Sequence, residues 1–152
     1  MPASECKINE PAPSFNLSNA DGKTVSLEDF RGKQPVLLIF YPGDFTPGCT
    51  VQLCAIRDDW KQFEQANVAV FGINHADALS HKQFSDEHHF PFPLLIDPHK
   101  RASKKFGAVR SLFGTIVIRR IVVGIDAHGV VRYYRKGMPK NSEILKALKT
   151  YA

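Results

Sequence analysis

The sequence has few cysteines and no long apolar run, and these two absences exclude whole classes of protein. Its three cysteines are too few for a disulfide scaffold, and an odd number leaves at least one unpaired. No apolar stretch approaches the ~18 residues that a membrane span needs. The first ten residues lack the apolar segment of a secretory signal, so we expect a cytoplasmic protein.

A strong charge of one sign is also missing. The formal net charge is +5, from 20 Lys and Arg against 15 Asp and Glu, and the charges are scattered along the chain. The densest basic cluster, His99-Lys100-Arg101 with Lys104 and Lys105, is typical of the solvated face of a short helix. We therefore expect neither a nucleic acid nor a membrane as a partner.

Signatures of metals and cofactors are absent as well. The six histidines pair with no cysteine at zinc-finger spacing, so we expect no metal site and place the histidines on the surface. Gly43 and Gly48 bracket a cysteine and do not form a phosphate-binding loop. With no flavin, haem or nicotinamide signature, we expect no cofactor. Electrons for any redox reaction must then come from a thiol partner.

The apolar pattern predicts one α/β domain over residues 1–152. Continuous apolar runs, typical of strands covered on both faces, occupy residues 36–41, 68–73 and 94–96. Helical spacing predicts helices over residues 53–63, 78–88, around 102–106 and over 142–151. Two further strands, 121–125 and 130–134, flank a turn that ends in Gly129 and predict a hairpin. Strands that alternate with helices, followed by a hairpin, indicate a central mixed sheet with helices on both faces.

The most informative segment runs from Phe40 to Thr50, where a buried strand ends, a loop rich in Pro and Gly follows, and a helix begins. Thr46 fits the N-cap and Pro47 the first helical position, which places Cys49 in the first turn. There the unpaired backbone N–H groups and the helix dipole favour an anion, here the nucleophilic thiolate. Cys49 should face inward, towards the carboxyl ends of the strands, where open α/β sheets build sites. Taken alone, it fits a small buried hydrophobe at a helix start equally well.

Residues 41–50 (Tyr-Pro-Gly-Asp-Phe-Thr-Pro-Gly-Cys-Thr) resemble the active-site signature of the peroxiredoxins. The segment is most similar to the bacterioferritin comigratory protein (PrxQ) branch, which carries a second cysteine five residues further on, here Cys54. Similar segments occur along most of the chain, including residues 12–15, 29–30 and 90–95 with Asp97. The resemblance implies a thioredoxin-like fold. It also implies a thiol peroxidase that reduces hydrogen peroxide or alkyl hydroperoxides and is recycled by thioredoxin or a similar dithiol protein.

The resemblance further implies a role for each site residue. Cys49 would attack the peroxide and become a sulfenic acid, and Cys54 would condense with it in an intramolecular disulfide. Thr46 would hydrogen-bond the thiolate and the bound peroxide, and Pro42 would keep water out. Arg120, six residues before an Asp in the family pattern, would hold the developing negative charge.

The position of this cation stays open at the level of the sequence. The chain departs from the family after Arg120, because Ile121-Val122-Val123-Gly124 replaces small polar and Thr-Phe-like residues. Arg119 offers a second cation. Neighbouring strand residues point to opposite faces, so only one of the two can face Cys49, and the register favours Arg120.

Alternatives also remain for the other thiols and for the activity. Cys54 fits an ordinary half-exposed thiol on the polar side of its helix, and Cys6, in an N-terminus expected to be mobile, fits no motif. A thiol–disulfide oxidoreductase on the same fold is the main rival, although that activity favours Cys-x-x-Cys. A non-catalytic binding domain would leave Cys49 unreactive towards peroxide. Because an intramolecular resolving cysteine needs no second subunit, we expect a monomer.

Helix geometry gives one more prediction. Five residues along an α-helix correspond to a rise of about 7.5 Å and a rotation of roughly 140°, which separates the Cα atoms of Cys49 and Cys54 by about 8.6 Å. A disulfide needs Cα atoms within ~7 Å. The reduced protein should therefore have one continuous helix across both cysteines, and oxidation should unwind its first turns.

Overall fold

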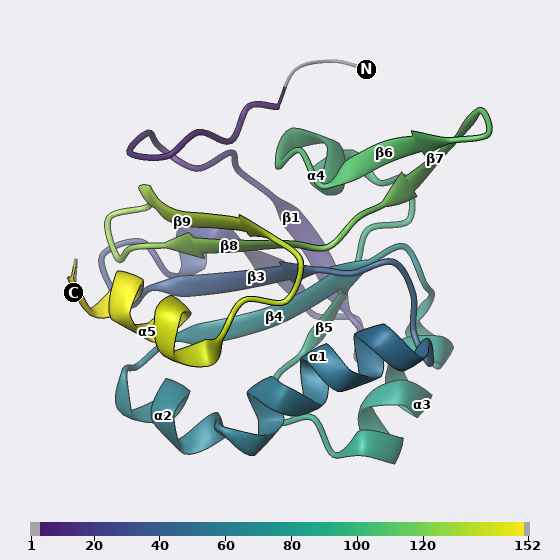
Figure 1. Cartoon of the computed structure of the whole chain (residues 1–152), viewed down its shortest axis with the longest axis horizontal. Helices are drawn as coiled ribbons and strands as arrows, with labels where there is room; N and C mark the ends of the chain where they lie inside the picture. The colour runs from purple at the N-terminus through teal and green to yellow at the C-terminus, as the bar shows by residue number, and fades with distance from the viewer. Residues whose placement is uncertain (1–3, 151–152) are drawn as a thin grey trace.

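The centre of the molecule is a seven-stranded mixed β-sheet (Figure 1). The computed structural model describes residues 4–150. The strands of this sheet are β1 (Asn16–Asn19), β2 (Thr24–Ser26), β3 (Val36–Phe40), β4 (Ala69–Asn74), β5 (Leu94–Ile96), β8 (Ile121–Ile125) and β9 (Val131–Lys136). Their order is β2-β1-β5-β4-β3-β8-β9, with β3, β4 and β5 parallel and the other neighbours antiparallel. β3 and β8 are buried along their whole length, which explains their continuous apolar sequences.

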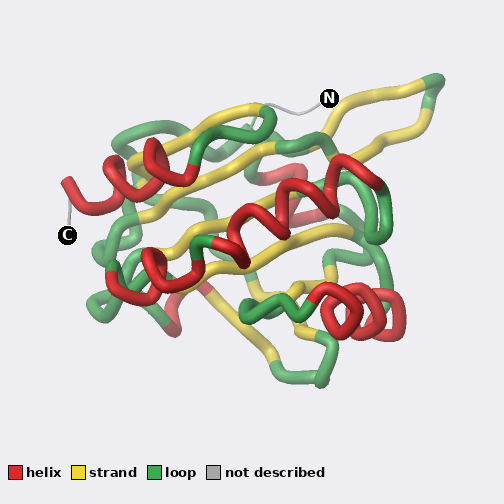
Figure 2. The backbone as a smooth tube through the Cα atoms, turned by 60° about the horizontal axis from the view of Figure 1, so that its bottom comes forward, coloured by secondary structure: helices red, strands yellow, loops and turns green. Residues whose placement is uncertain are grey.

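Helices cover both faces of this sheet. They are α1 (Pro47–Asp58), α2 (Trp60–Gln65), α3 (Ala78–His88), α4 (Arg101–Lys105) and α5 (Asn141–Thr150), together with the 3₁₀ turn η1 (Leu27–Asp29). Figure 2, in which the bottom of Figure 1 comes forward, shows helices lying across the strands on that side. None of the helices in the described part of the chain is long and apolar enough to cross a membrane.

The side chains of β3 alternate between two separate core clusters. Leu37 and Ile39 pack in a cluster with residues of α1, α2, α3 and α5. Val36, Leu38 and Phe40 belong to a second cluster, which includes residues of the N-terminal segment and of the region around α4. The predicted mixed sheet with helices on both faces is thus confirmed, and the period of two along β3 divides the core.

The fold differs from the prediction in several features, among them the strands β1 and β2, which were not predicted. The apolar stripe from Leu53 to Phe63 is divided between two helices, because the backbone at Asp59 (φ −103°, ψ 19°) leaves the helical conformation. A separate hairpin, β6 (Val109–Leu112) with β7 (Thr115–Ile118), was not predicted. Its two-residue turn, Phe113 and Gly114, has positive φ at both positions, and it projects from the body of the molecule (Figure 1).

Two expectations about individual residues are wrong. Cys6 is buried in the core cluster on the α4 side of the sheet, so the segment around it is not a mobile terminus, and burial raises the pKa of its thiol to about 12. His81 is fully buried and is not a surface histidine. Polar partners contact it from a loop and a strand that are distant in sequence, which explains how a histidine is accommodated there.

Candidate active site

Cys49 lies in the first turn of α1 and is fully buried. Thr46 is the N-cap, with an extended backbone (φ −76°, ψ 144°), and Pro47 begins the helix. The Thr46 hydroxyl does not cap the helix, because it donates a hydrogen bond to the carbonyl oxygen of Gly43 at 2.9 Å. The N–H groups of the first turn are therefore not occupied by this side chain, and the Cys49 thiol lies in that turn, excluded from bulk water.

The guanidinium of Arg120 packs against the start of α1. Its Nη2 atom lies 2.6 Å from the position that a Cβ atom on Gly48 would occupy, so only a glycine leaves room for it there. Its Nη1 atom donates to Oε1 of Gln52 at 3.1 Å, and Gln52 in turn donates to the carbonyl oxygen of Gly137 at 3.2 Å. Gln52 thus holds the cation beside the residue that precedes Cys49.

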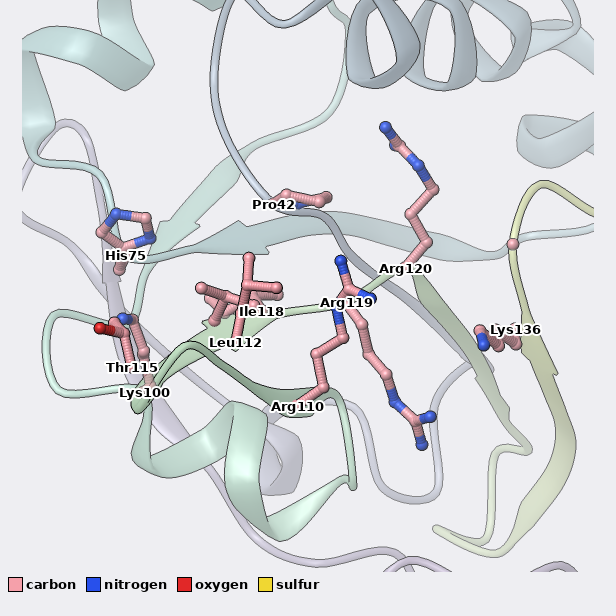
Figure 3. Close-up of a pocket in the computed structure, with 12 residues that line it drawn as sticks. Pro42, His75, Lys100, Arg110, Leu112, Thr115, Ile118, Arg119, Arg120 and Lys136 are labelled. Carbon is pink, nitrogen blue, oxygen red and sulfur yellow. The ribbon is translucent and has the colours of Figure 1, made fainter.

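The neighbouring Arg119 takes the opposite direction. Its Nε atom donates to the carbonyl oxygen of Gly107 at 3.1 Å, on the side of α4. Figure 3 shows the two side chains pointing apart. Of the two arginines, it is therefore Arg120 whose charge lies beside the helix start.

The remaining predicted residues lie close along the chain but differ in exposure. Pro42 follows β3 and is exposed, and together with Arg120 it lines a cavity of about 700 Å³. Cys54 is half-buried and packs against the same core cluster as Cys49. Both thiols are free, and α1 is one continuous helix through both positions. Within residues 4–150, no group of three or more His, Cys, Asp or Glu is arranged to hold a metal ion.

Asp44 is a site residue to which the sequence analysis gave no role. Its carboxylate lies in the cysteine loop and is only 2% exposed. Oδ1 accepts from the Tyr41 hydroxyl at 2.6 Å and from Nδ2 of Asn74 at 3.1 Å, and Oδ2 accepts from the Ser80 hydroxyl and from Nδ1 of His81, both at 2.7 Å. The loop is thereby fastened to the end of β4 and to the start of α3.

Hydrogen bonds determine the charge of this carboxylate. Burial by itself raises the pKa of Asp44, but the bonds from His81, Tyr41 and Ser80 together outweigh it and hold that pKa below its ordinary value. The second ring nitrogen of His81 lies 2.9 Å from the carbonyl oxygen of Leu95, so both nitrogens face acceptors. Both ring nitrogens of this fully buried histidine therefore have a hydrogen-bond partner.

The hydrogen-bonded pair of Asp44 and His81 was missed because its partners come from distant parts of the chain. Ser80 and His81 lie 36 and 37 residues after Asp44. One signal was nevertheless present in the sequence: a charged residue four positions after β3, a strand whose sequence is apolar throughout. Buried carboxylates are almost always paired, so a cation or several donors near Asp44 could have been sought.

Residues 8–134 match the AhpC/TSA family. The chain belongs to this family. It is 48% identical over 121 residues to the chloroplastic peroxiredoxin Q of Triticum aestivum, covering 80% of this chain and 55% of that protein. It is 43% identical over 150 residues to the chloroplastic peroxiredoxin Q of Populus jackii, covering 95% and 70%. The chain thus spans just over half the length of the wheat protein.

Solved structures in the same family share the fold. Peroxidoxin BcpB from Mycobacterium tuberculosis superimposes with a TM-score of 0.87 at 26% identity, covering 97% of this chain and 99% of that one. A mutant of PrxQ from Xylella fastidiosa gives a TM-score of 0.87 at 25% identity, covering 97% and 98%. The predicted resemblance to the PrxQ branch and the predicted thioredoxin-like fold are both confirmed.

Proposed function

We propose that this member of the AhpC/TSA family is a thiol peroxidase in which Cys49 is the nucleophile. The observation that carries the proposal is the joint position of a fully buried thiol in the first turn of α1 and a guanidinium packed against Gly48. Helix N–H groups and a fixed cation favour the thiolate over the thiol, and they are already in place when negative charge develops. Similarity to the peroxiredoxin Q proteins supports the same reaction.

The reaction has two steps in the protein. The Cys49 thiolate attacks the terminal oxygen of the hydroperoxide, an S–O bond forms and the O–O bond breaks. Sulfur is oxidised to the sulfenic acid, while the other oxygen leaves as alkoxide or hydroxide and takes up a proton. Arg120 and the N–H groups of α1 stabilise the charge on the leaving oxygen. The Cys54 thiol then attacks the sulfenic sulfur, water leaves and a disulfide forms.

Several finer assignments belong to the same proposal. The reductant is a thioredoxin-like dithiol protein, and the protein works as a monomer, since both cysteines of the disulfide lie on one chain. The location is cytoplasmic, in keeping with three free cysteines. The two plant relatives named above are chloroplastic, so fractionation that recovers the protein with chloroplasts would overturn the location. A light-scattering mass of twice one chain would overturn the monomer.

Rapid mixing of the reduced protein with hydrogen peroxide tests the activity. Cys49→Ser should abolish peroxide consumption, because a serine hydroxyl stays protonated at neutral pH. Cys54→Ser should still react once, accumulate the sulfenic acid and overoxidise under excess peroxide. Residual turnover in Cys49→Ser, or normal cycling of Cys54→Ser with thioredoxin, would place the reaction on other residues.

The two adjacent arginines provide a matched pair of variants. Arg120→Ala should slow the peroxide step by about two orders of magnitude, comparable to the loss of one oxyanion-stabilising group. Arg119→Ala removes the same charge one residue away and should leave the rate within about twofold, since its side chain bonds to Gly107 on the other side.

The rival oxidoreductase activity is tested with insulin disulfides, which this protein should not reduce faster than a free thiol does.

A further inference from the structure

The cavity lined by Pro42 and Arg120 extends along the β6–β7 hairpin (Figure 3). Its volume of about 700 Å³ falls in the range of small-molecule sites, roughly 300–1,000 Å³. Hydrogen peroxide is far smaller than this space. The cavity therefore has room for a substrate group that hydrogen peroxide does not possess.

The charges of this cavity are all of one sign. Lys and Arg side chains line it without any Asp or Glu: Lys100, Arg110, Arg119, Arg120 and Lys136. Within residues 4–150, none of them forms an ion pair with a carboxylate. Three of them hydrogen-bond neutral acceptors, as Lys100 does with the carbonyl oxygen of Ile116 at 2.7 Å. Their positive charge is not neutralised, and a concave site with such walls concentrates anions.

One face of the hairpin combines charge with apolar surface. Arg110 and Leu112 alternate along β6, and Val117 lies opposite Arg110 on β7, so all three side chains share a face of the two-stranded sheet. Figure 3 shows Arg110 reaching from β6 towards the side on which Pro42 and Arg120 lie. Burial, and after it the charge of Lys100, lower the pKa of His75, which also lines the cavity.

We propose that this cavity binds an alkyl hydroperoxide that carries an anionic group such as a carboxylate. The inference rests on the proposed peroxidase function and names its substrate class. The hydroperoxide end lies at Cys49 and Arg120, the carbon chain contacts Leu112 and Val117, and the anion pairs with Arg110 and Lys136. These two cations have no hydrogen-bond or ion-pair partner within the described residues.

The chemistry of such a substrate balances like that of any hydroperoxide. The terminal OH group passes to the Cys49 sulfur, which is oxidised by two electrons as the O–O bond breaks. The alkoxide that leaves takes up a proton and becomes an alcohol, and the carboxylate is unchanged. The product therefore keeps the group that the cavity recognises, and it should bind there as well.

A matched pair of substrates tests the proposal: 5-hydroperoxy-5-methylhexanoate and its uncharged methyl ester. For the wild-type protein, kcat/KM for the carboxylate should exceed that for the ester by about tenfold, the equivalent of one partly desolvated charge pair. The ratio should fall as salt is raised, because salt screens the interaction. Equal values for the two substrates at low salt would overturn the proposal.

Three variants assign the effect to the cavity. Arg110→Gln and Lys136→Gln should each reduce the carboxylate-to-ester ratio by about threefold, and the double variant should bring it near one. Lys61→Gln removes an exposed charge from α2, outside the cavity, and should leave the ratio unchanged. A ratio that falls equally in Lys61→Gln would attribute the preference to net charge, against the proposal.

Binding of the product separates this inference from the peroxidase function. The alcohol 5-hydroxy-5-methylhexanoate should bind to the Cys49→Ser protein in a calorimetric titration, and Arg110→Gln should weaken that binding. If hydrogen peroxide is not consumed but the alcohol binds, the peroxidase function is wrong and the anion site stands. If hydrogen peroxide is consumed but the alcohol does not bind and the ester reacts as fast as the carboxylate, only the anion site is wrong.

Discussion

The cysteine loop and the first turns of α1 follow one another in the sequence, but they are held in very different ways. The loop is fastened by the Asp44 carboxylate, whose four hydrogen bonds reach β4, α3 and the loop itself. The start of α1 lacks a side-chain cap from Thr46, and glycine, a poor helix former, occupies position 48. Cys49 thus lies just beyond the boundary between a fixed segment and a weakly held one.

This difference explains how one segment can serve two states. The proposed reduced site needs an intact first turn, because Cys49 lies in it and Arg120 packs against its Gly48. The proposed Cys49–Cys54 disulfide would need the same turn to unwind, since the two cysteines are too far apart on a helix. A firm anchor at Asp44 lets the turn open without displacing the strand before it.

Hydrogen exchange should show the largest difference between the two parts. On oxidation to the Cys49–Cys54 disulfide, amides of residues 48–57 should exchange more than about a hundredfold faster, as expected for local unfolding. Amides of β3 should keep their protection, because strand neighbours on both sides hold them. Equal protection of residues 48–57 in a fully disulfide-bonded sample would show that the helix does not open.

Replacing the anchor should lower the global stability. Asp44→Asn keeps the shape of the side chain but leaves donors and His81 without their acceptor, and it should cost about 3 kcal/mol of unfolding free energy. Asp86→Asn is the control, because its exposed ion pair with Lys82 contributes less than about 1 kcal/mol. Urea unfolding measures both. A cost no larger for Asp44→Asn than for Asp86→Asn would mean that the loop needs no anchor.

Acid should weaken the same anchor. The pKa of Asp44 in the folded protein lies below its ordinary value of 3.8, so the carboxylate stabilises the fold fully above that value. This contribution is lost as the pH falls through the folded pKa. The stability difference between the wild type and Asp44→Asn should therefore shrink as the pH falls below about 4. A difference that grows in acid would contradict the direction of the shift.

The smallest change in stability is expected at the weakly held turn. Gly48→Ala improves helix propensity by about 1 kcal/mol, but the new Cβ would displace the Arg120 guanidinium, so the net effect should stay within about 1 kcal/mol. The peroxide step should nevertheless slow by about tenfold, because the cation moves. Gly43→Ala is the control, since its Cβ would meet only the Thr46 methyl group at an ordinary 3.6 Å. An unchanged rate in Gly48→Ala would separate Arg120 from the reaction.

The sequence reveals those parts of the fold that follow from local pattern. β3 and β8 are apolar over their whole length and β4 up to its last residue, Asn74, and α1 begins at a Thr-Pro pair, so each could be located without a structure. The short polar strand β1 and the hairpin β6–β7 lack such a pattern, because exposed residues interrupt them.

The site divides in the same way. The place of Cys49 follows from the helix start, and that of Arg120 from the resemblance to the family pattern. Asp44, His81 and Gln52 act through partners in other elements, and nothing in the local sequence specifies those contacts. Contacts of this kind depend on how the elements pack. A single sequence therefore indicates them only weakly, by a polar residue next to a buried segment.

Cys6 is the third thiol of the chain, and its location determines whether it can exchange disulfides with Cys49 and Cys54. It lies in the core cluster on one side of the sheet, whereas Cys49 and Cys54 belong to the other. The sheet therefore separates it from the pair, and its raised pKa keeps it in the unreactive thiol form at neutral pH. Although the number of cysteines is odd, a native-state thiol titration should count two groups, and mispaired isomers should form only after unfolding.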